Sequence, residues 1–588
     1  MEPYKWIWSY VSRYKYKLTI SLLLGLAVAA AALINPYVSG RIVGDVFQGG
    51  MLEKLGGYLI IIISVTFTRM VVRYIYFTML EQASQDILLD LRKDIYNRIQ
   101  EQNFSFFDAN KVGDIMSRIT GDLEAVRNMV SHVLHAAFEN IVIFIVAVIL
   151  MFTLNWQMTL MMLVFSPVIF YSTYKQSREI KPAYTQIRDQ FATLNSVCQE
   201  NISGNRVVKA FTKEDEEIVK FIKENQEYSD RNLKSVKIWV KYLPRLEFCA
   251  GMLYFVLLLV GGIFVITERM ELWQLVTMNG YLWAVNDPMR ISGWLVNDTQ
   301  RFVASLEKIF DMMRQRIYIQ NPENPIVKEK LSGEISFENV SFSYDRNNPK
   351  ALVLKNLNFT ALPGQTIGIV GATGSGKTTL INLIGRFYDA TFGKIIVDGV
   401  DVKDYGLQSL RKGISSAGQD VFLFSDTVEG NIAYGASDAA MEHVIECAAI
   451  ASADGFIKTM PEGYDTIVGE RGVGLSGGQK QRISLARALA VNPSVIILDD
   501  TTSAVDMETE HEIQLALRDK YADVTKFIIA HRISSVRNAD MILVVDNGEI
   551  IERGTHNELL AQQGYYFGLF TDQYGDYKEE MKLINGPQ

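Results

Sequence analysis

Three segments in the second half of the 588-residue chain contain residue types that nucleotide chemistry requires. The stretch from Gly371 to Thr378 reads GATGSGKT, which satisfies the pattern of a phosphate-binding loop. The apolar run Val495-Ile496-Ile497-Leu498 ends in a carboxylate at Asp499. Between the two lies an LSGGQ stretch, made of Leu475, Ser476, Gly477, Gly478 and Gln479. A phosphate loop alone indicates only a nucleotide site, whereas the three segments in this order are far more specific.

Transfer of a phosphoryl group to water needs a cation on the phosphates, a metal ion and an oriented water molecule. Lys377 supplies positive charge between the β- and γ-phosphates, and the Thr378 hydroxyl is suited to bind Mg²⁺. Residues 366–370 are predicted to form a buried strand that leads into the loop, and the chain from Thr378 onward is predicted to be a helix. The amides at the start of this helix favour a bound phosphate. Asp499, at the end of its strand, is predicted to be a further partner of the metal.

These motifs resemble the nucleotide-binding domain of ATP-binding cassette (ABC) transporters, which implies ATP and Mg²⁺ as cofactors. In that family an aromatic residue matching Tyr344 stacks on adenine. A glutamine matching Gln419 senses the γ-phosphate, and a switch histidine matching His531 contacts it. The resemblance assigns ATP binding to Tyr344, Gly371, Ala372, Thr373, Gly374, Ser375, Gly376, Lys377, Thr378 and Thr379. It assigns the metal to Thr378, Gln419 and Asp499, and catalysis to Asp500, His531 and Gln419. The LSGGQ stretch of one subunit completes the site of the other, which implies a dimer.

Position 500 departs from the family pattern, because the family places a glutamate there as the general base and this chain has Asp500. Aspartate is one methylene shorter, and a misplacement of about 1 Å can lower a rate about a hundredfold. A weakened base beside an intact LSGGQ resembles one half of the heterodimeric bacterial multidrug exporters. The partner would then be a second half-transporter with glutamate at this position. A homodimer that tolerates aspartate is the alternative.

The composition indicates a chain that is partly embedded in a membrane. Hydrophobic residues make up 48% and charged residues 21%, with a mean hydropathy of +0.09. The net charge of -8 and the absence of a basic domain argue against nucleic acid as a partner. The three cysteines, Cys198, Cys249 and Cys447, lack the spacing of a metal site. The amino terminus has neither the pattern of a cleavable signal peptide nor that of a transit peptide.

Six membrane spans are predicted from uncharged or nearly uncharged runs long enough to cross a bilayer. They lie at residues 18–40, about 55–80, two within 140–174, 248–267 and 272 to about 294. The loops at 81–132 and 175–245 are rich in Lys and Arg, which places them and both termini on the cytoplasmic side of the cell membrane. Both loops are predicted to be helical extensions of the spans, since apolar residues recur at helical spacing at Leu88, Leu89, Leu91, Ile95 and Ile99.

The predicted fold is a membrane all-α domain of six helices, followed by an α/β P-loop ATPase domain of the ABC type. The transmembrane domain is placed at 1–320, a linker at 321–330, the nucleotide-binding domain at 331–575 and a polar tail at 576–588. Within the second domain, Ile335 to Val340 alternates as a strand, and Asp546-Asn547-Gly548-Glu549 is predicted to be a hairpin turn.

Two cytoplasmic segments and three intramembrane charges are further candidates. Residues 103–118 and 200–211 are similar to the loops of ABC exporters that hold the coupling helices, which seat on the nucleotide-binding domains. The simpler alternative is that Phe104, Phe106 and Phe107 cap a helical hairpin. Charged residues inside spans point to function by default. Arg69, Asp287 and Arg290 are therefore candidates for a substrate cavity, and an intrahelical Asp287–Arg290 pair is the alternative.

The order of the two domains is typical of exporters. The predicted function is ATP-driven export of lipophilic or drug-like small molecules across the cytoplasmic membrane. A homodimeric lipid flippase is one alternative, and an ATP-gated channel or regulatory ATPase is another. Import of siderophores by an exporter-like fold is a further possibility, because these motifs do not distinguish import from export. An exporter with its own peptidase domain is disfavoured, because no Cys/His domain precedes the first span.

Overall fold

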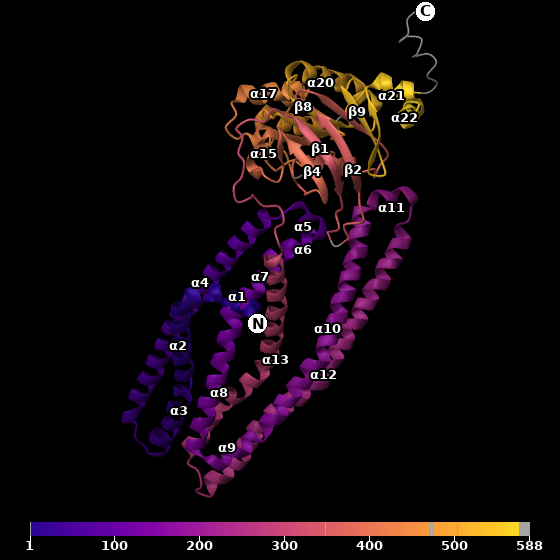
Figure 1. Cartoon of the computed structure of the whole chain (residues 1–588). Coiled ribbons are helices and arrows are strands. Elements are labelled where there is room, and N and C mark those ends of the chain that lie inside the picture. The colour runs from indigo at the N-terminus through magenta and orange to yellow at the C-terminus, as the bar shows by residue number, and fades with distance from the viewer. Residues whose placement is uncertain (1, 347, 470–471, 473, 502–503, 575–588) are drawn as a thin grey trace, which may run out of the picture. The chain divides into compact units, whose positions relative to one another are not determined.

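The computed structural model describes residues 2–346, 348–469, 472, 474–501 and 504–574. The chain divides into two compact units, and many of their elements are labelled in Figure 1. The first unit consists of Met1–Gln100 and Lys111–Gln315, and the second combines Glu101–Asn110 with the chain from Arg316 onward. The short segment 101–110 therefore groups with the C-terminal half and not with the helices on either side of it. The predicted polar tail at 576–588 lies outside the described residues.

The first unit is built from helices. They are α1 (Glu2–Val11), α2 (Lys15–Ala31), α3 (Ile34–Arg41), α4 (Glu53–Gln100), α6 (Val112–Ser117), α7 (Leu123–Asn128), α8 (Leu134–Leu154), α9 (Trp156–Leu163), α10 (Phe165–Ser203), α11 (Asn205–Phe211), α12 (Glu214–Ile266) and α13 (Leu272–Arg314). Wider π-helical turns at Ile42–Gln48, Arg118–Asp122 and Met129–Val133 continue the neighbouring helices. Helix α5 (Phe104–Ala109) belongs to the second unit.

Four helical stretches among the described residues are long and apolar enough to cross a membrane: Glu2–Gln48, Glu53–Gln100, Val112–Leu154 and Glu214–Ile266. They contain the first, second, third and fifth predicted spans. The fourth predicted span is helical but is divided between α9 and α10, and Lys175 follows soon after the start of α10. The sixth lies on α13, whose early turns contain polar residues that lower the hydropathy. These are Gln274, Asn279, Asn286 and Asp287.

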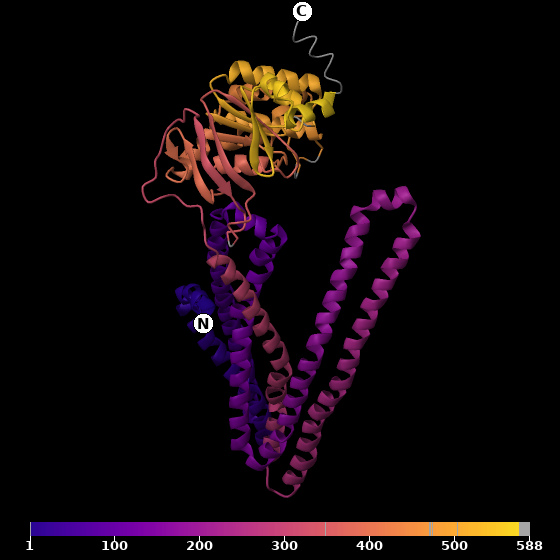
Figure 2. The same ribbon diagram turned by 45° about the vertical axis from the view of Figure 1, so that its right-hand side comes forward.

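The helical extensions predicted for the two long loops are present. Helix α4 continues unbroken from its apolar part to Gln100 and buries Leu88, Leu91, Ile95 and Ile99. Leu89 is 67% exposed, so the predicted apolar stripe is correct at four of its five positions. In the second loop, α10 and α12 lie side by side and are joined by α11 at the end of the hairpin (Figure 2).

The second unit contains two sheets. Their strands are β1 (Ile335–Phe342), β2 (Leu354–Ala361), β3 (Thr366–Val370), β4 (Phe392–Val397), β5 (Val400–Asp401), β6 (Ile414–Ala417), β7 (Val495–Asp499), β8 (Thr525–Ile529), β9 (Met541–Asp546) and β10 (Glu549–Gly554). One sheet has the order β2-β1-β4-β5 and is antiparallel; the other has the order β10-β9-β3-β8-β7-β6. The predicted strands at 335–340 and 366–370 are confirmed. The predicted hairpin turn is confirmed between β9 and β10, where Asn547 and Gly548 both have positive φ, as a type I′ turn requires.

Helices cover these sheets. They are α14 (Lys377–Ile384), α15 (Leu407–Gly413), α16 (Val428–Ile432), α17 (Met441–Ile450), α18 (Asp454–Lys458), α19 (Gly477–Ala490), α20 (Met507–Lys520), α21 (His556–Gln562) and α22 (Tyr565–Tyr574). Strand β7 is buried along its whole length. Val495 and Ile497 face one hydrophobic core and Ile496 and Leu498 face another, because successive side chains of a strand point to opposite faces. A parallel strand buried on both faces explains the uninterrupted apolar run in the sequence.

The register of the parallel strands brings the predicted site segments to one edge of the six-stranded sheet. Ile369 of β3 pairs with Ile529 of β8, and Ile529 pairs with Asp499 of β7. Leu498 of β7 pairs with Ala417 of β6. The phosphate loop, the segment with His531, the Asp499-Asp500 pair and the segment with Gln419 all follow these strand ends. Open α/β sheets bind ligands at this edge, where the carboxyl ends of the strands meet.

Candidate nucleotide-binding site

The phosphate loop is shaped by glycines that no other residue type can replace. Gly371 has φ +153°, and a Cβ atom there would lie 2.0 Å from the carbonyl oxygen of Val545. Gly376 has φ +106°, and a Cβ atom would lie 2.7 Å from the side chain of Leu354. The loop therefore passes against its neighbours with only backbone atoms at these two points, and it leads directly into α14.

Lys377 folds back over the loop that precedes it. The Lys377 ammonium donates hydrogen bonds to the carbonyl oxygens of Gly371 at 2.9 Å and Ala372 at 2.8 Å. The side chain is buried, and burial lowers the pKa of Lys377, while the negative charges of Asp499 and Asp500 act in the opposite direction. A charged phosphate is a stronger hydrogen-bond acceptor than a carbonyl oxygen. A phosphate bound at Lys377 would therefore stabilise the charged ammonium, which burial alone disfavours.

Ser375 supports a phosphate in the loop. Its hydroxyl oxygen is buried and has no hydrogen-bond partner among the described residues. Buried polar atoms without a partner are rare, and such an atom inside a glycine loop fits an anion with several acceptor oxygens. The residues present therefore fit the triphosphate that the motif predicts.

Thr378 and Asp499 meet although 121 positions separate them. The Thr378 hydroxyl donates a hydrogen bond of 3.0 Å to the Asp499 carboxylate. Burial raises the pKa of Asp499, and the bond from Thr378 and the charge of Lys377 partly offset this effect. A divalent cation beside these two groups would favour the carboxylate form of Asp499. A hydroxyl and a carboxylate are ligand types that Mg²⁺ accepts, so the pair fits the predicted metal.

Asp500 has a left-handed backbone, with φ +50°. Its N–H donates to the carbonyl oxygen of Ile529 at 2.9 Å, and its carbonyl oxygen accepts from the Gln481 amide at 3.4 Å. Gln481 also accepts a hydrogen bond from the Ala504 N–H at 3.1 Å and so joins the two segments after β7 to α19. Aspartate adopts the left-handed region more readily than longer side chains do. The structure therefore gives a second physical reason for aspartate at this position.

Tyr344 lies beside the end of the phosphate loop. Its hydroxyl is 3.0 Å from the hydroxyl of Thr379, and its ring is 46% exposed. The ring packs edge-on against Phe342 and Tyr388, with centroid distances of 4.8 and 5.2 Å. An exposed ring held in place at its edges presents a face to a flat ligand, as base stacking requires.

Gln419 and His531 both lie exposed at the carboxyl edge of the sheet. Gln419 comes two residues after β6, and His531 comes two residues after β8. The pKa of Asp499 is raised by burial, and a positive charge on His531 would act against this rise, so the imidazole lies within electrostatic range of that carboxylate. The carbonyl oxygen of His531 accepts a hydrogen bond of 2.7 Å from Gln573, a residue with no motif in the sequence.

The LSGGQ stretch begins α19 with a reciprocal cap. The Ser476 hydroxyl accepts from the Gln479 N–H at 3.2 Å, and the Gln479 side chain accepts from the Ser476 N–H at 2.9 Å. Gly478 approaches the backbone so closely that a Cβ atom would lie 2.7 Å from the carbonyl oxygen of Ala504. Ser476 and Gly477 remain exposed at the start of the helix. An exposed, capped helix start with glycines is suited to receive a phosphate from another molecule.

Comparison with known proteins places this geometry in a family. Residues 18–289 match the family model of the ABC transporter transmembrane region, and residues 354–503 match the family model described as ABC transporter. The chain is 38% identical over 591 residues to YknU, an uncharacterized ABC transporter ATP-binding protein of Bacillus subtilis, covering 100% of this chain and 99% of the relative. This chain belongs to the ABC exporter family. It is a multi-pass membrane protein with a helical transmembrane domain followed by an ABC ATPase domain, which couples ATP hydrolysis to transport.

Other relatives of this ABC exporter have more specific names. It is 35% identical to an ATP-dependent lipid A-core flippase of Syntrophus aciditrophicus, covering 96% of this chain and 93% of the relative. It is 33% identical to a putative multidrug export ATP-binding/permease protein, YgaD, of Bacillus subtilis, covering 96% and 98%. The solved structure of a bacterial Atm1-family ABC exporter with ATP bound has a TM-score of 0.76, 26% identity and coverage of 96% and 99%.

The segment 101–110 of this exporter makes specific contacts inside the second unit. Phe104 of α5 stacks on Phe387 with a centroid distance of 4.5 Å and an interplanar angle of 3°. Tyr388 donates a hydrogen bond of 2.6 Å to the Asp108 carboxylate. The sequence drew attention to Phe104 and Asp108, but it contained no signal for Phe387 or Tyr388 as their partners.

The charged residues proposed for the substrate cavity behave differently from one another. Asp287 and Arg290 form an ion pair of 3.5 Å along α13, and both side chains are exposed. This is the intrahelical pair that stood as the alternative, and an exposed pair can still line a cavity. Arg69 is partly buried on α4, and its Nε atom has no hydrogen-bond partner within the described part of the chain. Their role in binding substrate stays a prediction.

Proposed function

We propose that this exporter moves lipophilic or drug-like small molecules out across the cytoplasmic membrane, as one half of a heterodimer with one weak ATPase site. The basic residues of the loops at 81–132 and 175–245 support a cytoplasmic position for both termini. The multidrug-export name of one relative supports this substrate class. The observation that carries the proposal is the combination of Asp500 at the base position with an intact cap between Ser476 and Gln479.

In the proposed reaction, the residues of one chain serve two different sites. Lys377 and the loop amides would hold the phosphates of ATP, Thr378 and Asp499 with Gln419 would hold Mg²⁺, and Tyr344 would stack on adenine. ATP supplies the free energy for the change of conformation. Asp500 would orient water in this chain's own site, at a reduced rate because its carboxylate falls short. The start of α19, at Ser476, would close on the nucleotide held by the partner.

Exposed apolar residues support assembly with a second chain. On the second cytoplasmic loop, Val207 is 60% and Phe211 is 73% exposed in α11. In the ATPase domain, Phe422 and Phe424 are exposed a few residues after Gln419, and Phe424 stacks on the exposed Tyr434 at 4.4 Å. Apolar patches that lie next to functional residues mark interaction surfaces. We propose that α11 seats on the patch around Phe424 in the partner half.

The experiment compares two variants of this chain, each co-expressed with a second half-transporter that has glutamate at the position of Asp500. Ser476→Arg places bulk and charge at the start of α19 and is expected to abolish ATP hydrolysis and transport. Asp500→Asn removes a base that is already misplaced and is expected to leave most of the activity. If Asp500→Asn is as inactive as Ser476→Arg, the two sites are equivalent and the asymmetric proposal is wrong.

A homodimeric lipid flippase is the second candidate function. The lipid A-core flippase among the relatives favours it, and so does the left-handed backbone of Asp500, which supplies a conformational reason for aspartate. In a homodimer both substitutions would be severe. Reconstitution of the chain alone with a labelled lipid, followed by measurement of flipping, separates this candidate from the first.

A further inference from the structure

The loop that contains His531 is held by one side chain from the end of the described chain. The Gln573 carboxamide forms two hydrogen bonds with the backbone of this loop. Its oxygen accepts from the Ile533 N–H at 2.9 Å, and its nitrogen donates to the His531 carbonyl oxygen at 2.7 Å. Two bonds from one planar group fix the orientation of that group as well as its distance. The loop between the two contacted residues is therefore tied to α22.

Helix α22 is itself firmly placed. Tyr566 and Phe570 are buried in a hydrophobic core that also contains Ile533 of the loop and the flanking residues Ala530 and Val536. The Tyr566 hydroxyl bonds His556 at 2.8 Å, which joins α22 to α21. Gln573 lies three residues after Phe570 and so shares its side of the helix. The carboxamide is thus presented to the loop by a packed element and does not depend on a mobile side chain alone.

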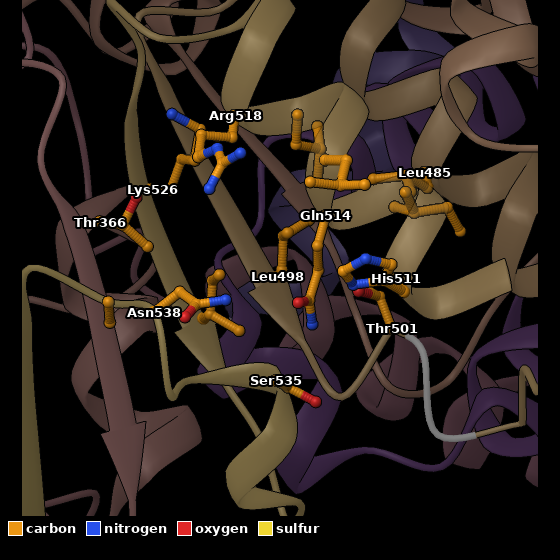
Figure 3. Close-up of a pocket in the computed structure, with 15 residues that line it drawn as sticks. Thr366, Leu485, Leu498, Thr501, His511, Gln514, Arg518, Lys526, Ser535 and Asn538 are labelled. Atoms are coloured by element: carbon orange, nitrogen blue, oxygen red, sulfur yellow. The ribbon is translucent and has the colours of Figure 1, made fainter. Parts of the chain in front are cut away.

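The side of the same loop that faces α20 is not closely packed. A cavity of about 90 Å³ lies there between α20 and the sheet, and Ser535, Asn538 and Ala539 form part of its wall (Figure 3). Figure 3 also shows Thr501, which follows Asp500, on this cavity, together with His511 and Gln514 of α20. A wall next to a void lacks the close contacts that otherwise fix a backbone. Polar contacts must therefore provide the restraint on this side.

Glu510 of α20 supplies such a contact. It is buried, accepts a hydrogen bond from the Ser535 hydroxyl and forms an ion pair of 3.7 Å with Arg532. The loop from His531 to Ser535 is accordingly held by polar contacts on two sides, from Glu510 of α20 and from Gln573 of α22. Within the described part of the chain, Gln573 is the residue that hydrogen-bonds the backbone of His531 itself.

We infer that Gln573 is a positioning residue for His531, and that the C-terminal helix thereby sets the rate of the hydrolytic step. This inference rests on the proposed role of His531 at the γ-phosphate. The bond to the His531 carbonyl fixes the peptide plane after the histidine, and that plane determines where the imidazole points. Without Gln573 the imidazole samples other directions, while the phosphate loop and Tyr344 still bind ATP normally.

The test measures single-turnover release of phosphate from γ-labelled ATP by the full chain in nanodiscs, which detects slow sites as well as fast ones. Gln573→Ala is expected to lower the rate about three- to tenfold, as the loss of one or two neutral hydrogen bonds to a catalytic loop implies. The affinity for a fluorescent ATP analogue is expected to stay unchanged. Asp572→Ala, at the neighbouring exposed position of α22, is the matched control and should leave the rate unchanged.

A double-mutant cycle with His531→Ala separates positioning from general stability. If Gln573 acts through His531, Gln573→Ala adds no further loss once His531 is removed. Multiplying losses overturn the inference, as does a normal rate for Gln573→Ala beside a slow His531→Ala. A normal rate for His531→Ala overturns the proposed role of the histidine and the inference with it. Should Gln573→Ala fold poorly, Gln573→Glu keeps the acceptor for Ile533, loses the donor to His531 and is judged by the same outcomes.

Discussion

Tyr388 donates its phenolic hydrogen to Asp108 over 2.6 Å, although 280 positions separate the two residues. The same tyrosine contacts Tyr344 edge-on at 5.2 Å, and Tyr344 contacts Thr379 at the end of the phosphate loop. Burial and the Asp108 carboxylate together raise the pKa of Tyr388, so the phenol stays protonated and remains a donor at any physiological pH. The buried ring of Tyr388 thus contacts both Tyr344, the residue proposed to stack on adenine, and Asp108 of the segment 101–110.

The first prediction is that removal of this bond uncouples hydrolysis from transport. Tyr388→Phe should leave the basal ATPase rate within about twofold, because the nucleotide contacts are intact and one hydrogen bond contributes only about 1 kcal/mol. Dye transport in inverted vesicles should fall by more than the ATPase rate does. Asp108→Asn can still accept the bond and should be mild, whereas Asp108→Ala should reproduce Tyr388→Phe.

A matched control for Tyr388→Phe exists elsewhere in the same unit. Tyr464 donates a hydrogen bond of 2.9 Å to Asp454, and burial and that carboxylate likewise raise its pKa. Both residues lie on or beside α18, outside the predicted nucleotide site. Tyr464→Phe should leave the ratio of transport to hydrolysis unchanged. An equal loss of coupling in both variants would show that the effect comes from the ATPase domain in general.

The second prediction concerns adenine. Tyr344→Ala should weaken binding of a fluorescent ATP analogue by about 1–2 kcal/mol, the lower part of the range of about 1–3 kcal/mol for stacking of a base on an aromatic ring. Tyr344→Phe loses the contact with the Thr379 hydroxyl but keeps the ring, and Tyr344→Trp enlarges the ring. Both should bind nearly as well as the native chain. Unchanged affinity of Tyr344→Ala would remove this residue from the site.

The sequence predicts those parts of the candidate site that follow from strand order. The phosphate loop, Asp499 and His531 each come directly after an apolar run, and parallel pairing of such strands brings their ends together. Side-chain contacts between distant segments have no such signal. Tyr388 with Asp108 and Gln573 with His531 depend on how α5 and α22 pack, which neither periodicity nor motif spacing specifies.

Prediction from the sequence is also incomplete for the helices. The apolar spacing on α4 predicts a long buried stripe, and four of its five residues are buried. Leu89 is exposed, because it falls off the 3.6-residue repeat that the other four keep. At Asp500 the sequence suggests a shortened base, but only the backbone dihedral adds that a left-handed conformation favours aspartate there.

The third prediction sets stability against function at Asp499. Burial raises the pKa of this carboxyl in the folded chain. Its contribution to stability is therefore fully present below the unfolded pKa, and it is lost as pH rises from that value through the folded pKa. Asp499→Asn removes the buried charge and can still accept the Thr378 hydroxyl bond. Without nucleotide, its melting temperature should rise by about 2 °C, a change on the order of 1 kcal/mol. With Mg²⁺ and ATP the native chain should gain more stability than the variant, and hydrolysis by the variant should be lost. A lower melting temperature of the variant without nucleotide would contradict this account.

The fourth prediction restores the general base. The chain purified alone should show little substrate-stimulated ATPase activity, since both of its sites then contain Asp500. Asp500→Glu extends the carboxylate by one methylene and should raise turnover of the chain alone about tenfold or more, the reverse of the loss expected for a 1 Å misplacement. Glutamate adopts the left-handed backbone of this position less readily than aspartate does, so the variant should be slightly less stable and its melting temperature should fall slightly.

The control variant Asp500→Asn measures the contribution of the carboxylate and should be slower than the native chain alone. If the native chain alone already turns over at an ordinary exporter rate, on the order of 1–10 per second, and Asp500→Glu changes nothing, aspartate is a competent base here and the homodimer becomes the functional unit.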